Sequence, residues 1–489
     1  MRKLIVVNEP RNWDLHVPGV ELVASRDYLT DPRFSKLRNV RVFNLSRSYA
    51  YQSRGYYVSL LAEARVHKVI PNAKAILDMR SRSMVKVLSR DLEGVMQSAL
   101  ADVPENVFTL SVYFGRNVEK RYDKLAHELN KVFQAPLFRA RFMRSDKWEL
   151  RSLRTIPMSE IPDEHHEDLE VFAEAYFGRR RYDPERADTS KYDLAILVNP
   201  EDTAVPSNKR AIVKFKQMAI SMGFAVDLIG PEDIDRVGEY DALFIRENTH
   251  VDHHTYRFAS RAKREGIEVM DSPEAILKCN NKVYLAEVLA ASGVPTPNTL
   301  IVHSENRDMV ASKFGLPVVL KLPDSTFSRG VVKASDKEEL KARLDEVLEE
   351  SDLAIAQEYI PTDYDWRVGV LDGKPLYACK YFMARGHWQI YNWSSSKHDD
   401  QTGNFETVAI EQAPPLVVES ALKAVFAIGV EGLFGVDLKE KDGKVYVIEV
   451  NECPNVDHGV EDKVLGDRIY EAIIRSLLDR IERKIGMRP

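Results

Sequence analysis

The sequence has 489 residues, of which 44% are hydrophobic and 29% are charged. At ~150 residues a domain this length predicts about three domains, and the apolar content excludes a disordered, fibrous or low-complexity protein. No apolar run approaches the ~20 residues that cross a bilayer, so no membrane association is expected. The first apolar run, residues 4–7, is shorter than the ~7–15 residues of a secretory signal. Three cysteines, none in a CxxC pair, predict reduced thiols and a cytoplasmic protein.

The net charge of −6 is unevenly distributed along the chain. Residues 1–150 carry 26 Lys and Arg against 16 Asp and Glu, whereas the remainder has an excess of sixteen negative charges. The basic part could face an anionic partner. Its cations are scattered, without a Lys/Arg block or interleaved aromatic residues, so a nucleic-acid partner is not expected.

The first part of the chain contains patterns of both strands and helices. An apolar run at 4–7, an alternating segment at 40–45, and segments 107–114 and 137–143 predict strands, and 55–65 predicts a helix. Residues 46–57 are dense in hydroxyls, arginine and tyrosine. They are interpreted either as a structural turn, which we favour, or as an anion-binding loop.

A compositional break follows at residues 178–191, which are basic and poor in apolar side chains and predict an exposed linker. Beyond it, strand patterns at 193–198, 225–229 and 241–245 and a helix at 208–222 predict a small doubly wound α/β unit. Arg246 ends the last of these strands. It is expected either to reach a substrate carboxylate or to take part in helix capping or a surface salt bridge.

The rest of the chain predicts an α+β arrangement without internal repeats. Residues 278–292 predict a helix that Gly293 ends. Further strands are expected at 317–322, 353–359, 366–371, 375–382, 432–439 and 444–451, with helices at 336–350 and 415–428. The sequence therefore predicts a multidomain protein that combines α/β and α+β parts.

The segment 432–455 carries the most specific chemistry. Two apolar strands flank the Asp442-Gly443 pair, which is typical of a tight hairpin turn. The turn places Asp437 near Glu449, and Asn451 leaves the same face of the strand as Glu449. Two buried carboxylates require a compensating cation, and hard oxygen ligands suit Mg²⁺ or Mn²⁺ bridging phosphates. The alternative is the solvated face of an edge hairpin.

Cationic and hinge-like segments precede this hairpin. Lys282 lies at the start of a helical segment, and Lys321 ends an apolar strand. Residues 323–331 are rich in hydroxyls and could fold over phosphates, although they lack the Walker P-loop pattern. Residues 354–360 predict a strand running into a hinge, and Asp365 and Arg367 follow two residues apart.

Taken together, this order of lysines, loop, Gln-Glu-Tyr-Ile strand, Asp-x-Arg and Asp…Glu-x-Asn resembles the ATP-grasp superfamily, and most closely the RimK-type carboxylate–amine ligases. The resemblance implies an ATP-grasp domain at 276–480 and a Rossmann-like pre-ATP-grasp domain at 192–275. Residues 1–160 resemble an extra N-terminal domain attached to some RimK-like proteins.

The resemblance also implies a role for each polar group. ATP would be held by phosphate-binding lysines, a loop hydroxyl, the hinge, a ribose-binding carboxylate and an asparagine near the γ-phosphate: Lys282, Lys321, Ser328, Glu358, Tyr359, Asp365 and Asn392. Asp437, Glu449 and Asn451 would hold two Mg²⁺ ions. Arg367 would stabilise the transferred phosphoryl group or the acyl phosphate. Lys380, which stands where the family has basic residues, would be the second catalytic residue. The segment 385–400 departs from the family's Arg- and Gly-rich pattern.

The implied activity is ATP-dependent ligation of a carboxylate to an amine through an acyl phosphate. The expected partners are a small-molecule or peptide carboxylate and an amine such as glutamate or another amino acid, and a homo-oligomer is compatible with this reading. Two alternatives remain on the same fold: a phosphotransferase, and an ATP-binding regulatory protein without ligation.

Overall fold

The computed structural model describes residues 2–486 except 14, 16, 18, 39, 82–83, 87–88, 90–91, 178–189, 203–204, 325–329, 392–401 and 485. The chain divides into two compact units, Met1–Tyr192 and Asp193–Pro489. Most of the expected linker at 178–191 lies outside the described residues. In the described part of the chain, no helix combines the length and the apolar character needed to span a membrane.

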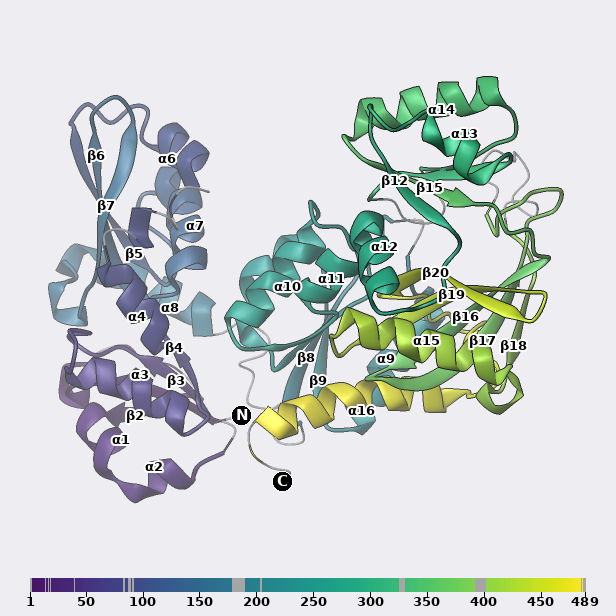
Figure 1. The fold of residues 1–489 in the computed structure, drawn as a ribbon. Coiled ribbons are helices and arrows are strands. Elements are labelled where there is room, and N and C mark those ends of the chain that lie inside the picture. The colour runs from purple at the N-terminus through teal and green to yellow at the C-terminus, as the bar shows by residue number, and fades with distance from the viewer. Residues whose placement is uncertain are drawn as a thin grey trace. The chain divides into compact units, whose positions relative to one another are not determined.

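The first unit contains a parallel and an antiparallel sheet (Figure 1). Its described strands are β1 (Arg2–Val7), β2 (Glu21–Ala24), β3 (Val40–Asn44), β4 (Lys68–Ile70), β5 (Val107–Tyr113), β6 (Leu137–Arg144) and β7 (Trp148–Thr155). Its described helices are α1 (Ser25–Thr30), α2 (Pro32–Lys36), α3 (Arg54–Ala64), α4 (Ala73–Arg80), α6 (Glu93–Ala99), α7 (Asp123–Phe133) and α8 (His166–Phe177). The parallel sheet has the order β2-β1-β3-β4, and the antiparallel sheet has the order β5-β6-β7.

The hydroxyl-rich segment 46–57 connects β3 to α3 and bonds largely to its own backbone. The Ser53 hydroxyl donates to the Ser48 carbonyl at 2.8 Å, and the Ser53 side chain also caps α3 by accepting from the Tyr56 backbone. The Tyr49 hydroxyl donates to the carbonyl of Asn44. These bonds agree with the interpretation as a structural turn.

The second unit is built on three sheets. Its described strands are β8 (Tyr192–Leu197), β9 (Phe224–Ile229), β10 (Ala242–Ile245), β11 (Glu268–Met270), β12 (Thr299–Val302), β13 (Val318–Lys321), β14 (Val331–Ala334), β15 (Ala354–Glu358), β16 (Tyr364–Leu371), β17 (Lys374–Phe382), β18 (Phe405–Val408), β19 (Leu433–Lys441) and β20 (Lys444–Glu452). Its described helices are α9 (Lys209–Ser221), α10 (His254–Arg264), α11 (Pro273–Asn280), α12 (Lys282–Ala291), α13 (Met309–Phe314), α14 (Lys337–Glu350), α15 (Pro415–Ile428) and α16 (Asp467–Lys484).

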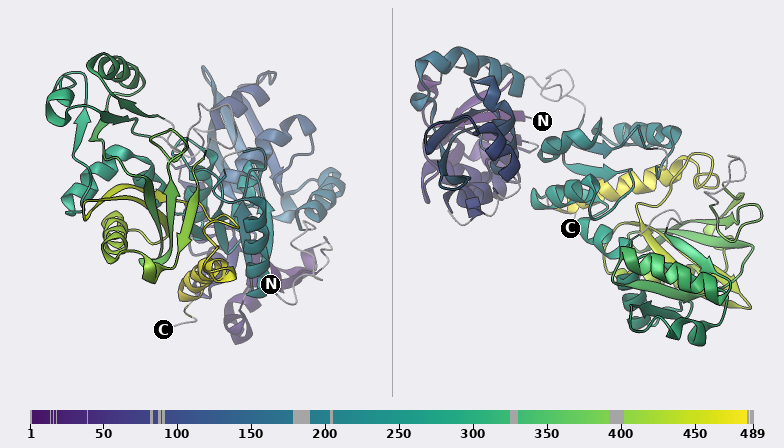
Figure 2. Two further views of the ribbon diagram at one scale, coloured as in Figure 1. Left: turned by 90° about the vertical axis from the view of Figure 1, so that its right-hand side faces the viewer. Right: turned by 90° about the horizontal axis from the view of Figure 1, so that it is seen from above.

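Each sheet of the second unit has its own core. The sheet β11-β10-β8-β9 packs against α10, while β12-β15-β13-β14 is antiparallel and packs against α14, which lies over it when the unit is seen from above (Figure 2). The antiparallel sheet β18-β17-β16-β19-β20 buries its Val, Leu and Phe side chains against α15 (Figure 1). The predicted combination of α/β and α+β parts is confirmed.

One segment predicted as a single helix is interrupted in the structure. The segment 278–292 forms the end of α11 and the whole of α12, with Asn281 between them. Asn281 has an extended backbone, and its side chain accepts from the backbone N–H of Tyr284 at 2.9 Å, so it caps a new helix. Lys282 is therefore the first residue of α12.

A pair of glycines makes room for side chains above β16 and β19. Gly369 and Gly435 are cross-strand neighbours. A Cβ on Gly369 would lie 2.1 Å from the Tyr377 ring, and one on Gly435 would lie 2.7 Å from Pro454. The buried Tyr377 hydroxyl donates to the Asn455 carbonyl at 3.0 Å, so the ring links this sheet to the chain that follows β20.

We expect Gly369→Ala to destabilise the second unit by about 1–3 kcal/mol, because the new methyl group must displace a buried ring. Hydrogen exchange of peptides from β16 and β17 in increasing urea would measure the loss. Gly94→Ala is the control, because this helical glycine has open space around its Cβ position and alanine favours helices. Unchanged exchange in Gly369→Ala would show that the close approach to Tyr377 is unimportant.

Candidate functional site

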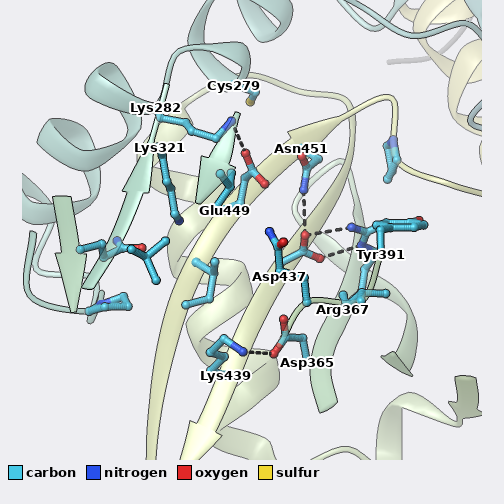
Figure 3. A pocket seen from close by; sticks show the side chains of 18 of the residues that line it. Cys279, Lys282, Lys321, Asp365, Arg367, Tyr391, Asp437, Lys439, Glu449 and Asn451 are labelled. Atoms are coloured by element: carbon cyan, nitrogen blue, oxygen red, sulfur yellow. Dashed lines mark hydrogen bonds and ion pairs between the residues drawn. The ribbon is translucent and has the colours of Figure 1, made fainter. Parts of the chain in front are cut away.

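A pocket in the second unit collects most of the polar residues that the sequence singled out (Figure 3). It is lined by side chains from α11 and α12, from β13–β16, from β19 and β20, and from residues 388–391. Of the predicted residues, the structure brings together Lys282, Lys321, Glu358, Tyr359, Asp365, Arg367, Asp437, Glu449 and Asn451. Ser328 and Asn392 lie outside the described residues.

The two carboxylates of the hairpin face each other across β19 and β20. Asp437 and Glu449 are cross-strand partners, and the Asn451 amide donates to Asp437 Oδ2 at 3.2 Å. This register depends on a bulge beside Asp437: residues 438–441 pair with 444–447, and Ile448 is the extra residue before Glu449. Without the bulge, Asp437 would oppose Ile448.

Arg367 pairs with Asp437 through two parallel hydrogen bonds. Its Nε and Nη2 atoms lie 2.7 and 2.8 Å from the two carboxylate oxygens, and both side chains are largely buried. Burial opposes the charged guanidinium, but Asp437 outweighs it and raises the pKa of Arg367 above its usual value. The two parallel hydrogen bonds orient the guanidinium as well as holding it in place.

Glu449 lies beside two lysine ammonium groups (Figure 3). Lys282 Nζ is 2.8 Å from Glu449 Oε1, and the backbone N–H of Lys282 donates to the Pro323 carbonyl, at the start of the predicted phosphate loop. Burial raises the pKa of Glu449, yet the charges of Lys282 and Lys321 outweigh this and keep it below its ordinary value. Glu449 is therefore an ionised carboxylate.

Lys321, at the end of β13, is only 7% exposed. Burial lowers its pKa to about 8 despite the attraction of Glu449. An ammonium held this way has lost most of its hydration before any ligand arrives. It is suited to an anionic partner such as a phosphate.

Lys439 is a pocket residue that the sequence analysis missed. Its ammonium lies 2.5 Å from Asp365 Oδ1 and 2.7 Å from the Thr362 hydroxyl. Burial raises the pKa of Asp365, with Lys439 opposing this effect. The two-residue spacing from Asp437 on β19 puts Lys439 on the same face, and that spacing could have identified it.

The hinge end of the pocket is apolar and aromatic. Tyr359 lies there with Trp388, and the aliphatic lining is supplied by Val319, Val331, Ile360 and Ile448. The backbone N–H of Glu358 donates to the Asn298 carbonyl at 2.9 Å, and its side chain accepts from the Asn298 amide. The Glu358 backbone N–H is thus already used within the protein.

Lys380 does not line the pocket. It pairs with Trp366 across β16 and β17, while Arg367 pairs with Cys379, so Lys380 and Arg367 leave opposite faces of the sheet. Its ammonium lies 3.1 Å from Glu406 and over the rings of Tyr364 and Trp366. The catalytic role predicted for Lys380 is incompatible with this position.

Arg246 is also a structural residue. It is 1% exposed, and its guanidinium donates to the carbonyls of Pro206 and Pro454 and to the hydroxyl of Ser207. It therefore holds together segments before α9 and after β20. These buried contacts with two carbonyls and a hydroxyl support neither contact with a substrate carboxylate nor a surface salt bridge for Arg246.

The donor set at the hairpin suits a hard cation. Among the described residues no group of three or more His, Cys, Asp or Glu side chains is arranged to hold a metal ion. Asp437, Glu449 and Asn451 instead offer two carboxylates and an amide oxygen, which is enough when phosphate oxygens and waters complete the coordination. The residues present therefore fit Mg²⁺ or Mn²⁺ bound together with a phosphate ligand.

Comparisons with known proteins match both units. A family model described as the RimK-like ATP-grasp N-terminal domain matches residues 25–172, and an ATP-grasp domain model matches residues 279–455. A D-alanine–D-alanine ligase from Neisseria meningitidis is 31% identical over 172 residues, which cover 34% of this chain and 55% of that protein. A probable α-L-glutamate ligase from Pectobacterium carotovorum is 24% identical over 230 residues, 46% of this chain and 72% of that protein.

Among solved structures, a D-alanine–D-alanine ligase from Bacillus anthracis matches with a TM-score of 0.49 and 18% identity, covering 60% of this chain and 99% of that one. The chain spans about half the length of the curated relatives it matches first. The two family models match successive stretches of one sequence, so the chain combines a RimK-like ATP-grasp N-terminal domain with an ATP-grasp domain.

Proposed function

We propose that this protein is an ATP-dependent ligase that joins a carboxylate to an amine. The observation that carries the proposal is the pairing of Asp437 with Glu449 in a pocket that also holds Lys282, Lys321 and Arg367. The names of the relatives, D-alanine–D-alanine ligase and probable α-L-glutamate ligase, support an amino acid or a peptide as one substrate.

The arrangement of apolar and charged lining residues favours one direction for the nucleotide. Its base would lie in the apolar slot beside Tyr359, where the hinge residues Glu358 and Tyr359 would offer backbone groups to it. Its ribose would meet Asp365, which Lys439 already orients. The phosphates would then reach Lys321 and Lys282, and Ser328 and Asn392 remain proposed contacts to them.

Asp437, Glu449 and Asn451 would hold Mg²⁺, or Mn²⁺, against the phosphates. When bound, the metal neutralises phosphate charge and favours transfer of the terminal phosphoryl group. Lys282 would exchange its contact with Glu449 for a phosphate oxygen, because that carboxylate would hold the metal. The negative charge of ATP would then replace that of Glu449 as the partner of this ammonium.

The ligation has two steps, phosphoryl transfer to the carboxylate and then attack by the amine. A substrate carboxylate oxygen attacks the γ-phosphorus of ATP, ADP leaves, and an acyl phosphate forms. An amine then attacks the acyl carbon, loses a proton and expels inorganic phosphate, which leaves an amide. Arg367, fixed by Asp437, would compensate charge on the transferred phosphoryl group, and preorganised charges of this kind supply much of the acceleration in phosphoryl transfer.

The decisive experiment incubates the full chain with ATP, Mg²⁺ and pools of carboxylates and amino acids. We expect ADP and phosphate to appear only when both a carboxylate and an amine are present, with an amide detected by mass spectrometry. A phosphorylated product without an amine requirement would instead favour a phosphotransferase. Nucleotide binding without turnover under every condition would favour a regulatory protein.

Glu449→Gln should lower the turnover rate at least ~10²-fold, because it removes a charged ligand of the proposed metal ion and so one strong electrostatic contact of the site. Asp442→Asn is the matched control: it removes a carboxylate from the exposed turn of the same hairpin, and asparagine tolerates the positive φ found there. Steady-state ADP release would compare the two variants. Near-normal turnover in Glu449→Gln would remove the metal assignment.

ATP affinity should fall as the pH rises through about 8. Burial lowers the pKa of Lys321 to about 8, so its ammonium is charged below that pH and neutral above it. Titration calorimetry with a non-hydrolysable ATP analogue between pH 7 and 9.5 would measure the change. Lys321→Arg should flatten the profile, because a guanidinium stays charged over this range. An equal fall in both proteins would place the titrating group elsewhere.

A further inference from the structure

The helix α15 packs one face against the five-stranded sheet and turns its other face outward in the second unit (Figure 1). Spacings of three, four and three residues place four exposed side chains on this outward face: Leu416, Glu419, Lys423 and Phe426. We call these four residues the α15 stripe. Phe426 is 87% exposed and Leu416 is 48% exposed, so the stripe has an apolar residue at each end and two charges between them.

The α15 stripe borders a groove on the surface of the second unit. Further apolar side chains complete the lining of this groove: Pro295, Leu422, Val425 and Val430. Exposed apolar surface with a polar rim marks a site of protein interaction, and buried aromatic side chains contribute much of the binding energy at such sites. The groove and the ring of Phe426 therefore have the character of a contact surface.

The two charges of the stripe are free to meet a partner. Glu419 precedes Lys423 by four residues, which is the order that favours an ion pair within one helix. Among the residues that the structure describes, neither side chain nevertheless takes part in an ion pair or a hydrogen bond. Both are exposed, so a second protein surface could pair with either charge without first breaking a contact within this chain.

The α15 stripe is complementary to itself about Ala421. Leu416 and Phe426 each lie five residues from Ala421, and Glu419 and Lys423 each lie two residues from it. Two copies of the helix packed antiparallel about a twofold axis at this point would set Leu416 against Phe426 of the second copy. The same axis would set Glu419 against Lys423 of the second copy. Each contact would occur twice, as in the isologous interface of a twofold dimer.

We propose that the outward face of α15 is the interface of a homodimer in which two copies of this helix pack antiparallel. The occupant of the groove is a second copy of this chain, because the charges and apolar ends of the stripe match those of the stripe itself. The interface lies on the face of α15 that points away from the sheet. In the described part of the chain, the groove and the pocket of the candidate site share no lining residue, so the inference does not depend on the proposed function.

Sedimentation velocity of the full chain at micromolar concentrations measures the association. We expect the wild type to dimerise and Phe426→Asp to weaken the dimer at least ~10-fold, because a carboxylate then meets an apolar side chain at both ends of the interface. Met309→Asp is the control: it changes a 54% exposed apolar residue on α13, outside the groove, and should dimerise like the wild type. A monomeric wild type, or an undiminished dimer in Phe426→Asp, would overturn the proposal.

Charge reversal tests the pairing of Glu419 with Lys423. Lys423→Glu and Glu419→Lys should each weaken the dimer about tenfold, because like charges then face each other twice. Mixing these two variants should restore association as a heterodimer, since an acidic stripe then faces a basic one. Each helix in the mixture keeps its own like-charge pair, so the recovery cannot come from repair within a helix. No recovery in the mixture would exclude the antiparallel register.

Disulfide cross-linking tests the register at the apolar ends. Under oxidised glutathione, a mixture of Leu416→Cys and Phe426→Cys should give a covalent dimer on a non-reducing gel. Either variant alone should not, because each position lies ~15 Å along the helix axis from its counterpart in the second copy, too far for a disulfide. The native cysteines, Cys279, Cys379 and Cys453, are buried and should not compete. Equal cross-linking in the single variants and in the mixture would overturn the proposed arrangement.

Discussion

The second unit is organised around two carboxylates that face each other in a mostly buried pocket. Like charges this close in a low-dielectric setting repel, so the arrangement persists only with compensating cations. Arg367 compensates Asp437, and Lys282 compensates Glu449. Each carboxylate of the hairpin is thus neutralised by a cation of the protein itself.

The rest of the unit serves to hold these charges at fixed positions. Asp437 and Arg367 lie on adjacent central strands of the five-stranded sheet, whose opposite face is sealed by α15. Small residues at Gly369 and Gly435 let Tyr377 and Pro454 pack close to the same face. Arg246 then ties the segment after β20 to the start of α9, so the walls of the pocket are anchored by buried hydrogen bonds.

Local patterns were enough to predict the hairpin and most central strands. The Asp442-Gly443 turn has positive φ at both residues, as the pairing of β19 and β20 requires, and apolar runs marked the buried strands. The break at Asn281 was missed because the flanking residues favour helix, and only the capping bond reveals a restart. The amphipathic α16 and short strands such as β12 and β14 were not anticipated, because their stability depends on packing.

Site residues that lie along a single strand could be predicted from the sequence. Those whose position depends on the pairing between two strands were harder to predict. Lys380 was misplaced because which face a side chain occupies depends on the register between β16 and β17. Trp388 belongs to an irregular segment whose path no periodic pattern describes. Lys439 was overlooked although the alternation along β19 already put it beside Asp437.

The extra residue in β20 has a consequence for what this hairpin can accommodate. Before Ile448 the odd-numbered positions, Val445 and Val447, are buried; after it the buried positions are Val450 and Glu452. The inversion leaves Ile448 and Glu449 as successive members of the pocket wall, one apolar and one charged. A regular strand would present only one of these neighbours, so a homologue without the extra residue would lose either the apolar side chain or the carboxylate from this wall of the pocket.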